Sequence, residues 1–452
     1  MIDLIRNHLA FIIIAISWVL VAVYGQALIY AWLPFTILLL KAKEQWPELL
    51  MGLLLFLVLS DMDKHINEMF IIKSVKNVFI VMLALFFIIE RNRFFPFSRV
   101  FNIFLPFFIY SFFPLIWSKV MFLGFQKTIS YGLMFLIIPN YVLYNYRMMG
   151  WPFFTNLIRF MAMILVAGFV VSFFTDISTD IGGRFRGLFG NPNGMAIYCF
   201  LCILLFTVLI SINKQAFTFR EKVVLYVIFF YFLIASGSRA SLAATMIFIF
   251  FARFFSYSPF LGFVVLLAIF GVAEVISANL QPIILALGLE EYFRLNTLED
   301  GSGRYFAWEF AWGHAQKFFV FGGGFANDEA LMKYYRLYLE RMGHQGGVHN
   351  SYLSFWLNVG LVGLVIFLRS FFLLFFKAGK LVPMSLAVMF SVLFSIMYES
   401  WLVGSLNPYT IVMLMIMTVL SEDEIVNWEA HASLEQEAVP EQEVEYLIAP
   451  AR

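Results

Sequence analysis

The stretch GMAIYCFLCILLFTVLIS, at residues 194–211, contains no charged side chain and is long enough to cross a lipid bilayer as a helix. Similar apolar runs recur along the chain. Hydrophobic residues make up 62% of the 452 residues and charged residues only 13%, and the mean hydropathy is +0.86. Because a soluble domain cannot bury that much apolar surface, we expect the protein to be surrounded by lipid.

About fourteen such runs predict an all-α polytopic membrane protein with about 12–14 transmembrane helices and one long, partly helical periplasmic loop. The runs are 9–24, 27–41, 48–60, 74–90, 99–117, 128–144, 155–175, 194–211, 221–236, 240–256, 259–280, 350–376, 381–398 and 405–420. The run at 48–60 is short, and the tight links at 25–26 and 257–258 could join neighbouring runs. The run from Leu9 is interpreted as a retained first span rather than a cleaved signal.

Positive charge predicts the orientation of these spans, because lysine and arginine favour cytoplasmic connections. The residues that fall in alternate connections are Lys41, Lys43, Arg91, Arg93, Arg99, Arg147, Arg159, Lys214, Arg220, Lys222, Arg253, Lys377 and Lys380. Lys73 and Lys76, in one short connection, depart from this pattern. The connections at 176–193 and 236–239 and the long segment 281–348 are then expected on the outer side.

Composition divides the chain into five predicted parts. They are an N-terminal transmembrane scaffold (1–175), transmembrane helices with outer-face arginine motifs (176–280), a periplasmic loop (281–349), C-terminal transmembrane helices (350–420) and a disordered acidic cytoplasmic tail (421–452). The net charge of +1 gives no indication of nucleic-acid binding. Cys199 and Cys202 lie three residues apart in one apolar run and have no partner pair, so neither a metal site nor a disulfide framework is expected.

Polar residues gather in the predicted outer connections, beginning with GRFRGLFGNPNG at residues 183–194. The glycines, asparagines and proline predict a tight turn directly before a span. Arg186, Asn191 and Asn193 are candidate anion-binding residues here, because backbone N–H groups at a helix start and arginine side chains both favour an anion. The alternative interpretation is a structural turn whose arginines keep their charged ends in water while their stems lie on apolar surface.

A second motif, Ser236-Gly237-Ser238-Arg239, separates two apolar runs by very few residues. An arginine inside a membrane costs about 2.5–3.5 kcal/mol on insertion scales, so Arg239 needs a partner, water or an anionic ligand. Its small neighbours leave room for a ligand. An interfacial arginine bonded to carbonyl groups is the alternative.

The long loop contains a third motif, Gly301-Ser302-Gly303-Arg304, which opens a predicted helix through Gln316 with Ser302 as its N-cap. A second helix is predicted over 327–342, with one apolar face that suits the membrane surface. Arg304 is the candidate functional residue of this loop. A packed lid without chemistry is the alternative.

The fourth motif, His349-Asn350-Ser351, closes the polar loop and opens an apolar helix, which Asn350 can cap. A histidine titrates near neutral pH and can take a proton from an attacking hydroxyl, while arginines can neutralise a diphosphate without a metal. Together these residues suggest a group transfer whose leaving group is a lipid-linked phosphate. An ordinary interfacial histidine is the alternative, and Glu399 is expected near a span end without a chemical role.

The ordered set of motifs resembles the O-antigen ligase/polymerase family of bacterial membrane glycosyltransferases. The resemblance covers about residues 180–370. It rests on Arg186-Gly187, Asn191-Pro192-Asn193, Ser236-Gly237-Ser238-Arg239, Ser302-Gly303-Arg304, Gly322-Gly323-Gly324, and His349-Asn350 followed by Gly360 and Gly363. The chain carries more apolar runs than is usual for the family.

The resemblance implies a glycan donor carried on undecaprenyl diphosphate and used at the periplasmic face of the bacterial inner membrane. It implies an inverting transfer that needs no metal or other cofactor, with lipid A-core or a growing glycan as the acceptor. His349 would be the catalytic base or would orient the acceptor. Arg239 and Arg304 would lie near the diphosphate with Arg186 as a third arginine, and Asn191, Asn193 and Asn350 would belong to the same substrate site.

Several functions remain open at this stage. The first hypothesis is a ligase, and the second is a polymerase that extends the lipid-linked repeat; transfer to a protein acceptor is a further variant. From another class, a polysaccharide flippase or transporter is disfavoured, because such proteins show paired repeats with broken helices near mid-membrane and neither is evident.

Overall fold

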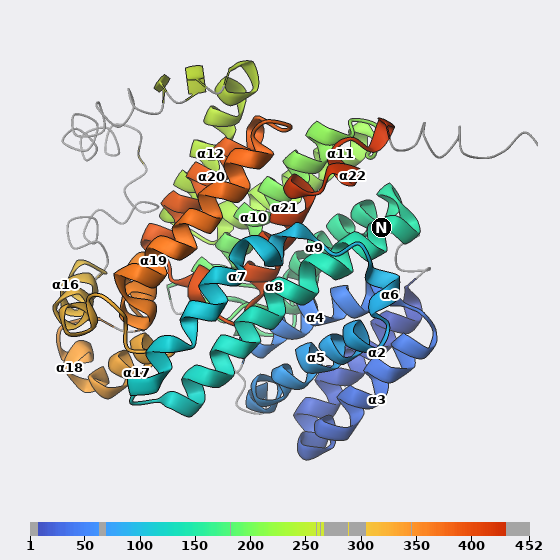
Figure 1. The fold of residues 1–452 in the computed structure, drawn as a ribbon. Helices are drawn as coiled ribbons and strands as arrows, with labels where there is room; N and C mark the ends of the chain where they lie inside the picture. The colour runs from blue at the N-terminus through green and yellow to red at the C-terminus, as the bar shows by residue number, and fades with distance from the viewer. Residues whose placement is uncertain are drawn as a thin grey trace, which may run out of the picture.

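The computed structural model describes residues 8–62, 69–180, 182–258, 260–262, 264–265, 288, 304–344 and 346–430. Over these residues the regular elements are helices, and the one isolated β-bridge joins Thr179 to Phe185 (Figure 1). Seven segments there are long and apolar enough to cross a membrane, and three shorter apolar helices accompany them. The predicted all-α polytopic membrane protein is confirmed.

The helices follow the predicted apolar runs closely. In chain order they are α2 (Leu9–Leu20), α3 (Ile29–Ala42), α4 (Trp46–Ser60), α5 (Phe70–Ile89), α6 (Arg91–Phe94), α7 (Arg99–Ser111), α8 (Met121–Met149), α9 (Trp151–Ser172), α10 (Pro192–Ile212), α11 (Phe219–Ala235), α12 (Arg239–Tyr257), α16 (Arg304–Ala315), α17 (Asn327–Tyr334), α18 (Arg336–Arg341), α19 (Ser351–Ala378), α20 (Met384–Tyr398), α21 (Pro408–Ser421) and α22 (Asp423–Val426).

The first two apolar runs form a helical hairpin. Trp18 Nε1 donates to Thr36 Oγ1 at 2.8 Å, and Trp32 Nε1 donates to Ser17 Oγ at 2.8 Å. These bonds join residues that are 18 and 15 positions apart in the chain, so the chain turns back between α2 and α3. Residues 9–42, which count as one of the seven segments by length and composition, are therefore a helical hairpin rather than one straight helix.

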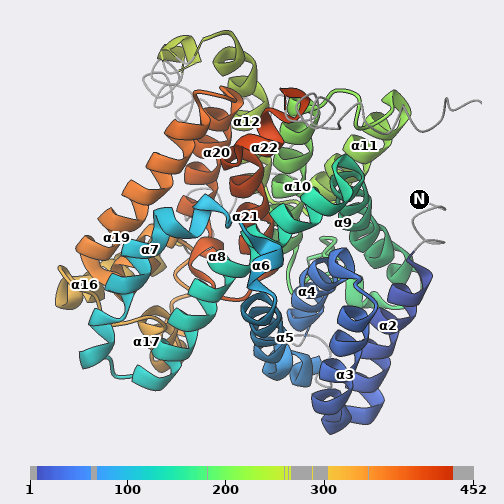
Figure 2. The same cartoon turned by 45° about the vertical axis from the view of Figure 1, so that its right-hand side comes forward.

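The centre of the bundle is formed by helices that are apolar on every side. Almost every residue of α4 is buried, and so are those of α10 and α21. A helix that is hydrophobic all round is expected inside a bundle rather than at its surface. The short run at 48–60 is thus an internal helix, while α2 and α3 lie at one edge of the molecule and α16 and α17 at the other (Figure 2).

One end of the bundle carries a set of ion pairs and is called the ion-pair end below. The pairs are Lys41–Glu90, Arg93–Glu44, Arg99–Asp423, Arg147–Glu424 and Arg159–Glu221. They join connections that the charge pattern assigned to one side of the membrane. Lys76, an exception to that pattern, instead donates from Nζ to the carbonyl of Leu406 at 3.1 Å.

The connections at 173–191, 236–238, 343–350 and 399–407 gather at the other end, called the loop end below. Phe185 N donates to the carbonyl of Ala235 at 3.2 Å, and Asn350 N donates to Ser400 Oγ at 2.9 Å. The two turn motifs and the histidine motif therefore share one end of the bundle.

The beginning of the acidic tail is packed, which differs from the expected disordered segment at 421–452. Glu422 accepts from Ser98 Oγ at 2.7 Å and from Arg99 N at 2.9 Å, and Trp428 Nε1 donates to the carbonyl of Ile212 at 3.4 Å. Partners on neighbouring connections hold these residues against the bundle. The rest of the tail, from residue 431, lies outside the described residues.

Helix α19 is broken at Gly360, where the backbone has φ 67° and ψ −175°. The segment 319–324 enters the break: Gly323 N donates to the carbonyl of Leu357 at 2.9 Å, and Leu361 N donates to the carbonyl of Phe319 at 2.9 Å. These bonds satisfy backbone groups that a helix break leaves open, which is essential at membrane depth. No broken helix was expected. The space beside Gly360 is filled by a loop of the same chain, not by another helix or a lipid.

Close approach of the two backbones explains why glycines occupy both sides of this break. A β-carbon added at Gly360 would lie 2.3 Å from the carbonyl oxygen of Val320, and one added at Gly322 would lie 2.4 Å from that of Asn358. Only glycine fits such spacing. The Gly322-Gly323-Gly324 and Gly360 motifs are therefore two halves of one contact.

The long loop forms α16 as predicted, followed by a 3-10 turn over Gln316–Phe318. The second predicted helix is two helices, α17 and α18, divided at Tyr335. The ring of Tyr335 packs on Phe310 of α16 at 5.3 Å, so this part of the apolar face meets protein, whereas Tyr334 is 82% exposed. The expected cap Ser302, Gly301 and Gly303, and most of the expected span at 259–280, lie outside the described residues.

Candidate functional site

At the loop end, several side chains bind the carboxylate of Glu399, which lies just after α20. Its Oε1 accepts from Arg304 Nη2 at 2.5 Å and from Asn193 Nδ2 at 3.0 Å, and its Oε2 lies 3.0 Å from His349 Nδ1. The side chain is 12% exposed. Three residues from three distant parts of the chain therefore share one nearly buried carboxylate.

The charge state of Glu399 follows from these partners. Burial by itself raises the pKa of the carboxyl, but the hydrogen bond and charge of His349 and the charge of Arg304 outweigh burial and lower the pKa of Glu399 below its ordinary value. An ionised carboxylate can only accept hydrogen bonds, so Nδ1 of His349 carries the proton. In the uncharged form of this imidazole, the unshared electron pair is therefore on Nε2.

The backbone at His349 is held in an unusual conformation, with φ 51°. Trp308 Nε1 donates to the His349 carbonyl at 3.3 Å, and Ser351 Oγ donates to the carbonyl of Glu399 at 2.8 Å. A left-handed residue other than glycine costs on the order of 1–3 kcal/mol, and such residues cluster at functional sites. The surrounding bonds hold the imidazole against Glu399 despite this cost.

Nε2 of His349 faces the turn formed by Gly346 and Gly347. A β-carbon added at Gly346 would lie 2.8 Å from Nε2. Because neither residue carries a side chain and the His349 side chain is 29% exposed, the proton-accepting nitrogen can be reached by a small polar group.

Arg184 extends the network to the two turn motifs. Its Nη2 donates to Asn193 Oδ1 at 2.6 Å, and its Nε donates to the carbonyl of Ser236 at 2.7 Å. The amide of Asn193 thus bridges Arg184 and Glu399. Arg239 begins α12 three residues after Ser236 and is half-buried.

Three of the predicted site residues hold local structure. Asn191 Oδ1 accepts from Gly194 N at 2.7 Å and caps α10, and Asn350 Oδ1 accepts from Leu353 N at 3.1 Å and caps α19. Arg186 is 8% exposed and donates from Nε to the carbonyl of Ile177 at 2.7 Å, within its own connection. The structure therefore brings together His349, Arg304 and Asn193, and it places these other three around them.

Glu399 and Arg184 were not selected from the sequence. Glu399 lies between the apolar runs 381–398 and 405–420, in a connection that the charge pattern puts on the same side as His349, and this feature could have identified it. Arg184 lies in the same turn as Arg186, and only the fold distinguishes their directions. Among the described residues, no group of three or more histidine, cysteine or acidic side chains is placed to hold a metal.

Residues 224–368 match the model of a protein family described as O-antigen ligase. The matched range includes Arg239, Arg304 and His349, whereas Asn193 precedes it and Glu399 follows it. The resemblance inferred from the motifs is confirmed over this range. No curated protein matches the chain.

Proposed function

We propose that this chain, an O-antigen ligase-like protein over residues 224–368, transfers a glycan from undecaprenyl diphosphate to an acceptor hydroxyl. The reaction takes place at the loop end, on the periplasmic face of the bacterial inner membrane. One observation carries the proposal: His349 and Arg304, a proton acceptor and a permanent cation, are bound to the same carboxylate of Glu399.

The proposed step is a displacement at the anomeric carbon of the donor sugar. The acceptor oxygen forms a bond to that carbon while the bond from the carbon to the diphosphate oxygen breaks. The acceptor proton passes to Nε2 of His349, and undecaprenyl diphosphate leaves with the bonding electron pair. Attack opposite the leaving group inverts the anomeric centre.

Glu399 supports this step through His349. Its bond to Nδ1 fixes the tautomer in which Nε2 accepts a proton, and its negative charge stabilises the imidazolium that forms. Glu399 is therefore a positioning residue, held in turn by Asn193 and Arg184.

The arginines serve the departing diphosphate. A guanidinium carries five N–H donors, so the bond from Arg304 to Glu399 leaves donors for phosphate oxygens. Arg239 lies at the start of α12, where the backbone N–H groups of the first turn also favour an anion. The proposed transfer step needs no metal or nucleotide.

The break in α19 does not favour transport. Broken helices in transporters open their backbone groups to a substrate. Here the segment 319–324 occupies the break and uses those groups itself.

Transfer by the purified protein in detergent tests the proposal, because detergent removes the barrier that a flippase needs. The donor is an undecaprenyl-diphosphate-linked glycan, offered with lipid A-core or with a second lipid-linked repeat. We expect transfer by the native chain and a rate about 10²- to 10⁴-fold lower for His349→Ala. Undiminished transfer by a well-folded His349→Ala protein would refute the role of the imidazole.

A deletion strain distinguishes the two acceptors. A single repeat unit on lipid A indicates a lost polymerase, whereas free polymer on the carrier lipid indicates a lost ligase.

A further inference from the structure

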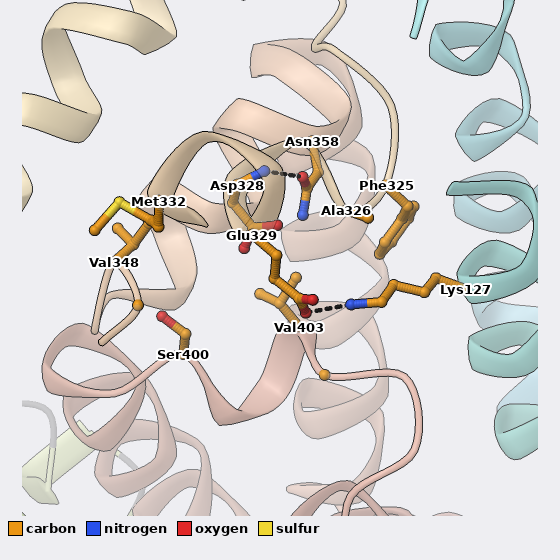
Figure 3. A pocket seen from close by; sticks show the side chains of 12 residues that line it. Lys127, Phe325, Ala326, Asp328, Glu329, Met332, Val348, Asn358, Ser400 and Val403 are labelled. Atoms are coloured by element: carbon orange, nitrogen blue, oxygen red, sulfur yellow. Dashed lines mark hydrogen bonds and ion pairs between the residues drawn. The ribbon is translucent and has the colours of Figure 1, made fainter. Parts of the chain in front are cut away.

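A pocket of about 200 Å³ lies between residues of α17 and α8 (Figure 3). Val348 and Ser400, the chain neighbours of His349 and Glu399, belong to its lining. The lining also includes Lys127, Phe325, Asp328, Glu329, Met332 and Asn358. We call it the inner pocket.

Polar and apolar groups alternate around the inner pocket. Asp328 is buried, and its N–H donates to Asn358 Oδ1 at 3.1 Å, which holds the carboxyl and the amide together at one end (Figure 3). An ion pair between Lys127 and Glu329 crosses the side toward α8. Met332 and Phe325 supply apolar surface. A buried carboxyl, an amide and an ammonium beside apolar walls suit a small ring that carries several hydroxyl groups.

The pocket opens toward a second, wider one of about 520 Å³, called the outer pocket below. The two share Glu329, Met332 and Gly347 in their linings. The rest of the outer pocket is lined by Lys333, Arg336, Leu339, Glu340, His344 and Gly346. Gly346 is also the residue against which Nε2 of His349 lies. His349 itself lines neither pocket, but its Nε2 lies against Gly346, whose neighbour Gly347 belongs to both linings.

The residues that line these two pockets do not include the arginines that we assign to the donor diphosphate. Neither pocket is lined by Arg184, Arg239 or Arg304. In the inner pocket Lys127 is already paired with Glu329, so no cation is left over for a diphosphate. Lys333 and Arg336 line only the outer pocket, so it is the inner pocket whose chemistry favours a neutral, hydroxyl-rich group over the phosphorylated end of the donor.

We propose that the inner pocket binds the terminal sugar of the acceptor glycan, with the preceding sugars in the outer pocket, so that a hydroxyl group is presented to Nε2 of His349. This inference rests on the proposed glycosyl transfer and adds the acceptor side to it. The group bound is the non-reducing end of a glycan in both cases, whether that glycan is carried on lipid A-core or on the lipid carrier.

The test uses two variants of the full-length protein in the transfer assay. Gly347→Phe places a ring where the two pockets meet, because a β-carbon at Gly347 meets no atom within 4 Å. Asp328→Asn keeps the shape of the inner pocket and removes one carboxylate. Gly313→Phe is the matched control, since Gly313 on α16 is exposed, also has open space and lines neither pocket. The KM for acceptor and the KM for donor are measured separately, with lipid A-core and with a lipid-linked repeat as acceptors.

We expect the acceptor KM to rise about tenfold or more in both variants. Asp328→Asn removes a hydrogen bond to a charged group, and Gly347→Phe blocks the site sterically. The donor KM and the Gly313→Phe protein should match the native chain. An unchanged acceptor KM in an active Asp328→Asn protein would overturn the inference alone, and so would a rise confined to the donor KM. Absence of transfer by the native chain with both acceptors would overturn the proposed function and this inference with it.

Discussion

At the scale of single residues, one carboxylate organises the candidate site. Glu399 binds His349, Arg304 and Asn193 while it is almost buried. Removing one member of a buried charged network leaves the others unpaired and costs about 3–5 kcal/mol. A substitution that preserves shape is therefore more informative than a truncation at this position.

Glu399→Gln is expected to lower kcat by about 10²- to 10⁴-fold while the protein still folds. The amide can still accept from Arg304, but an amide NH₂ facing Nδ1 favours the tautomer that carries its proton on Nε2, which removes the base. The measurement is kcat over a range of pH. Glu309→Gln, at an exposed carboxylate on α16 that lines neither pocket, is the control and should match the native chain. Native kcat in Glu399→Gln would show that the carboxylate does not set the tautomer.

His349→Asn separates the imidazole from the backbone that carries it. Asparagine tolerates the left-handed conformation seen at His349, whereas alanine tolerates it less well. We expect His349→Asn to melt at a higher temperature than His349→Ala and to be equally inactive. Thermal unfolding and the transfer assay check this together. An active His349→Asn protein would contradict a base at this position.

At the scale of elements, the loop segment 319–324 and helix α19 form one unit. The segment supplies backbone partners at the break, and its continuation into α17 supplies Asp328, whose N–H binds Asn358 of α19. The break therefore connects the folding of the long loop to the start of α19, where His349 and Asn350 lie. An element that looks like a surface loop is part of the core of the site.

Gly360→Ala is expected to destabilise the protein strongly. The β-carbon would lie 2.3 Å from the carbonyl oxygen of Val320 at a φ of 67°, so backbone strain of about 1–2 kcal/mol adds to overpacking of about 1–3 kcal/mol. Gly132→Ala in α8 is the control, because its nearest neighbour, Phe108, would be 3.5 Å away. The control should be neutral or more stable by about 0.5–1 kcal/mol. Equal melting temperatures of the two variants would mean that the break relaxes easily.

At the scale of the whole molecule, two buried carboxyls near the loop end, Glu399 and Asp328, respond to pH in opposite senses. The pKa of Glu399 is lowered, so its contribution to stability is complete above the ordinary carboxyl pKa of 4.5 and is lost as pH falls through the lowered value. Asp328 behaves in the opposite sense. Burial, followed by the charge of Glu329, raises the pKa of Asp328 above 3.8, so stability is lost as pH rises from 3.8 through the raised value.

Asp328→Asn is therefore expected to raise the melting temperature at pH 7, and its advantage over the native chain should shrink as pH falls toward 3.8. The measurement is the melting temperature of both proteins in detergent across this pH range. Glu309→Gln, an exposed carboxylate on α16, serves as the control and should show no such trend. If the variant is also a poorer transferase, the native carboxylate is retained for function at a cost in stability. A lower melting temperature at pH 7 would show that its hydrogen bonds outweigh its burial.

The sequence by itself determined the class of the protein and most of the helix positions. The length of an apolar run and the charges at its ends are local properties, and they decide whether a segment enters the membrane. It also singled out His349, Arg304 and Asn193, whose types and motifs are unusual at span ends. Only the tertiary structure decided that Glu399 joins them, that Arg184 rather than Arg186 turns inward, and that segment 319–324 fills the break at Gly360. Each of these depends on contacts between residues far apart in the chain, and no local pattern encodes which distant partner a side chain or a backbone carbonyl will meet.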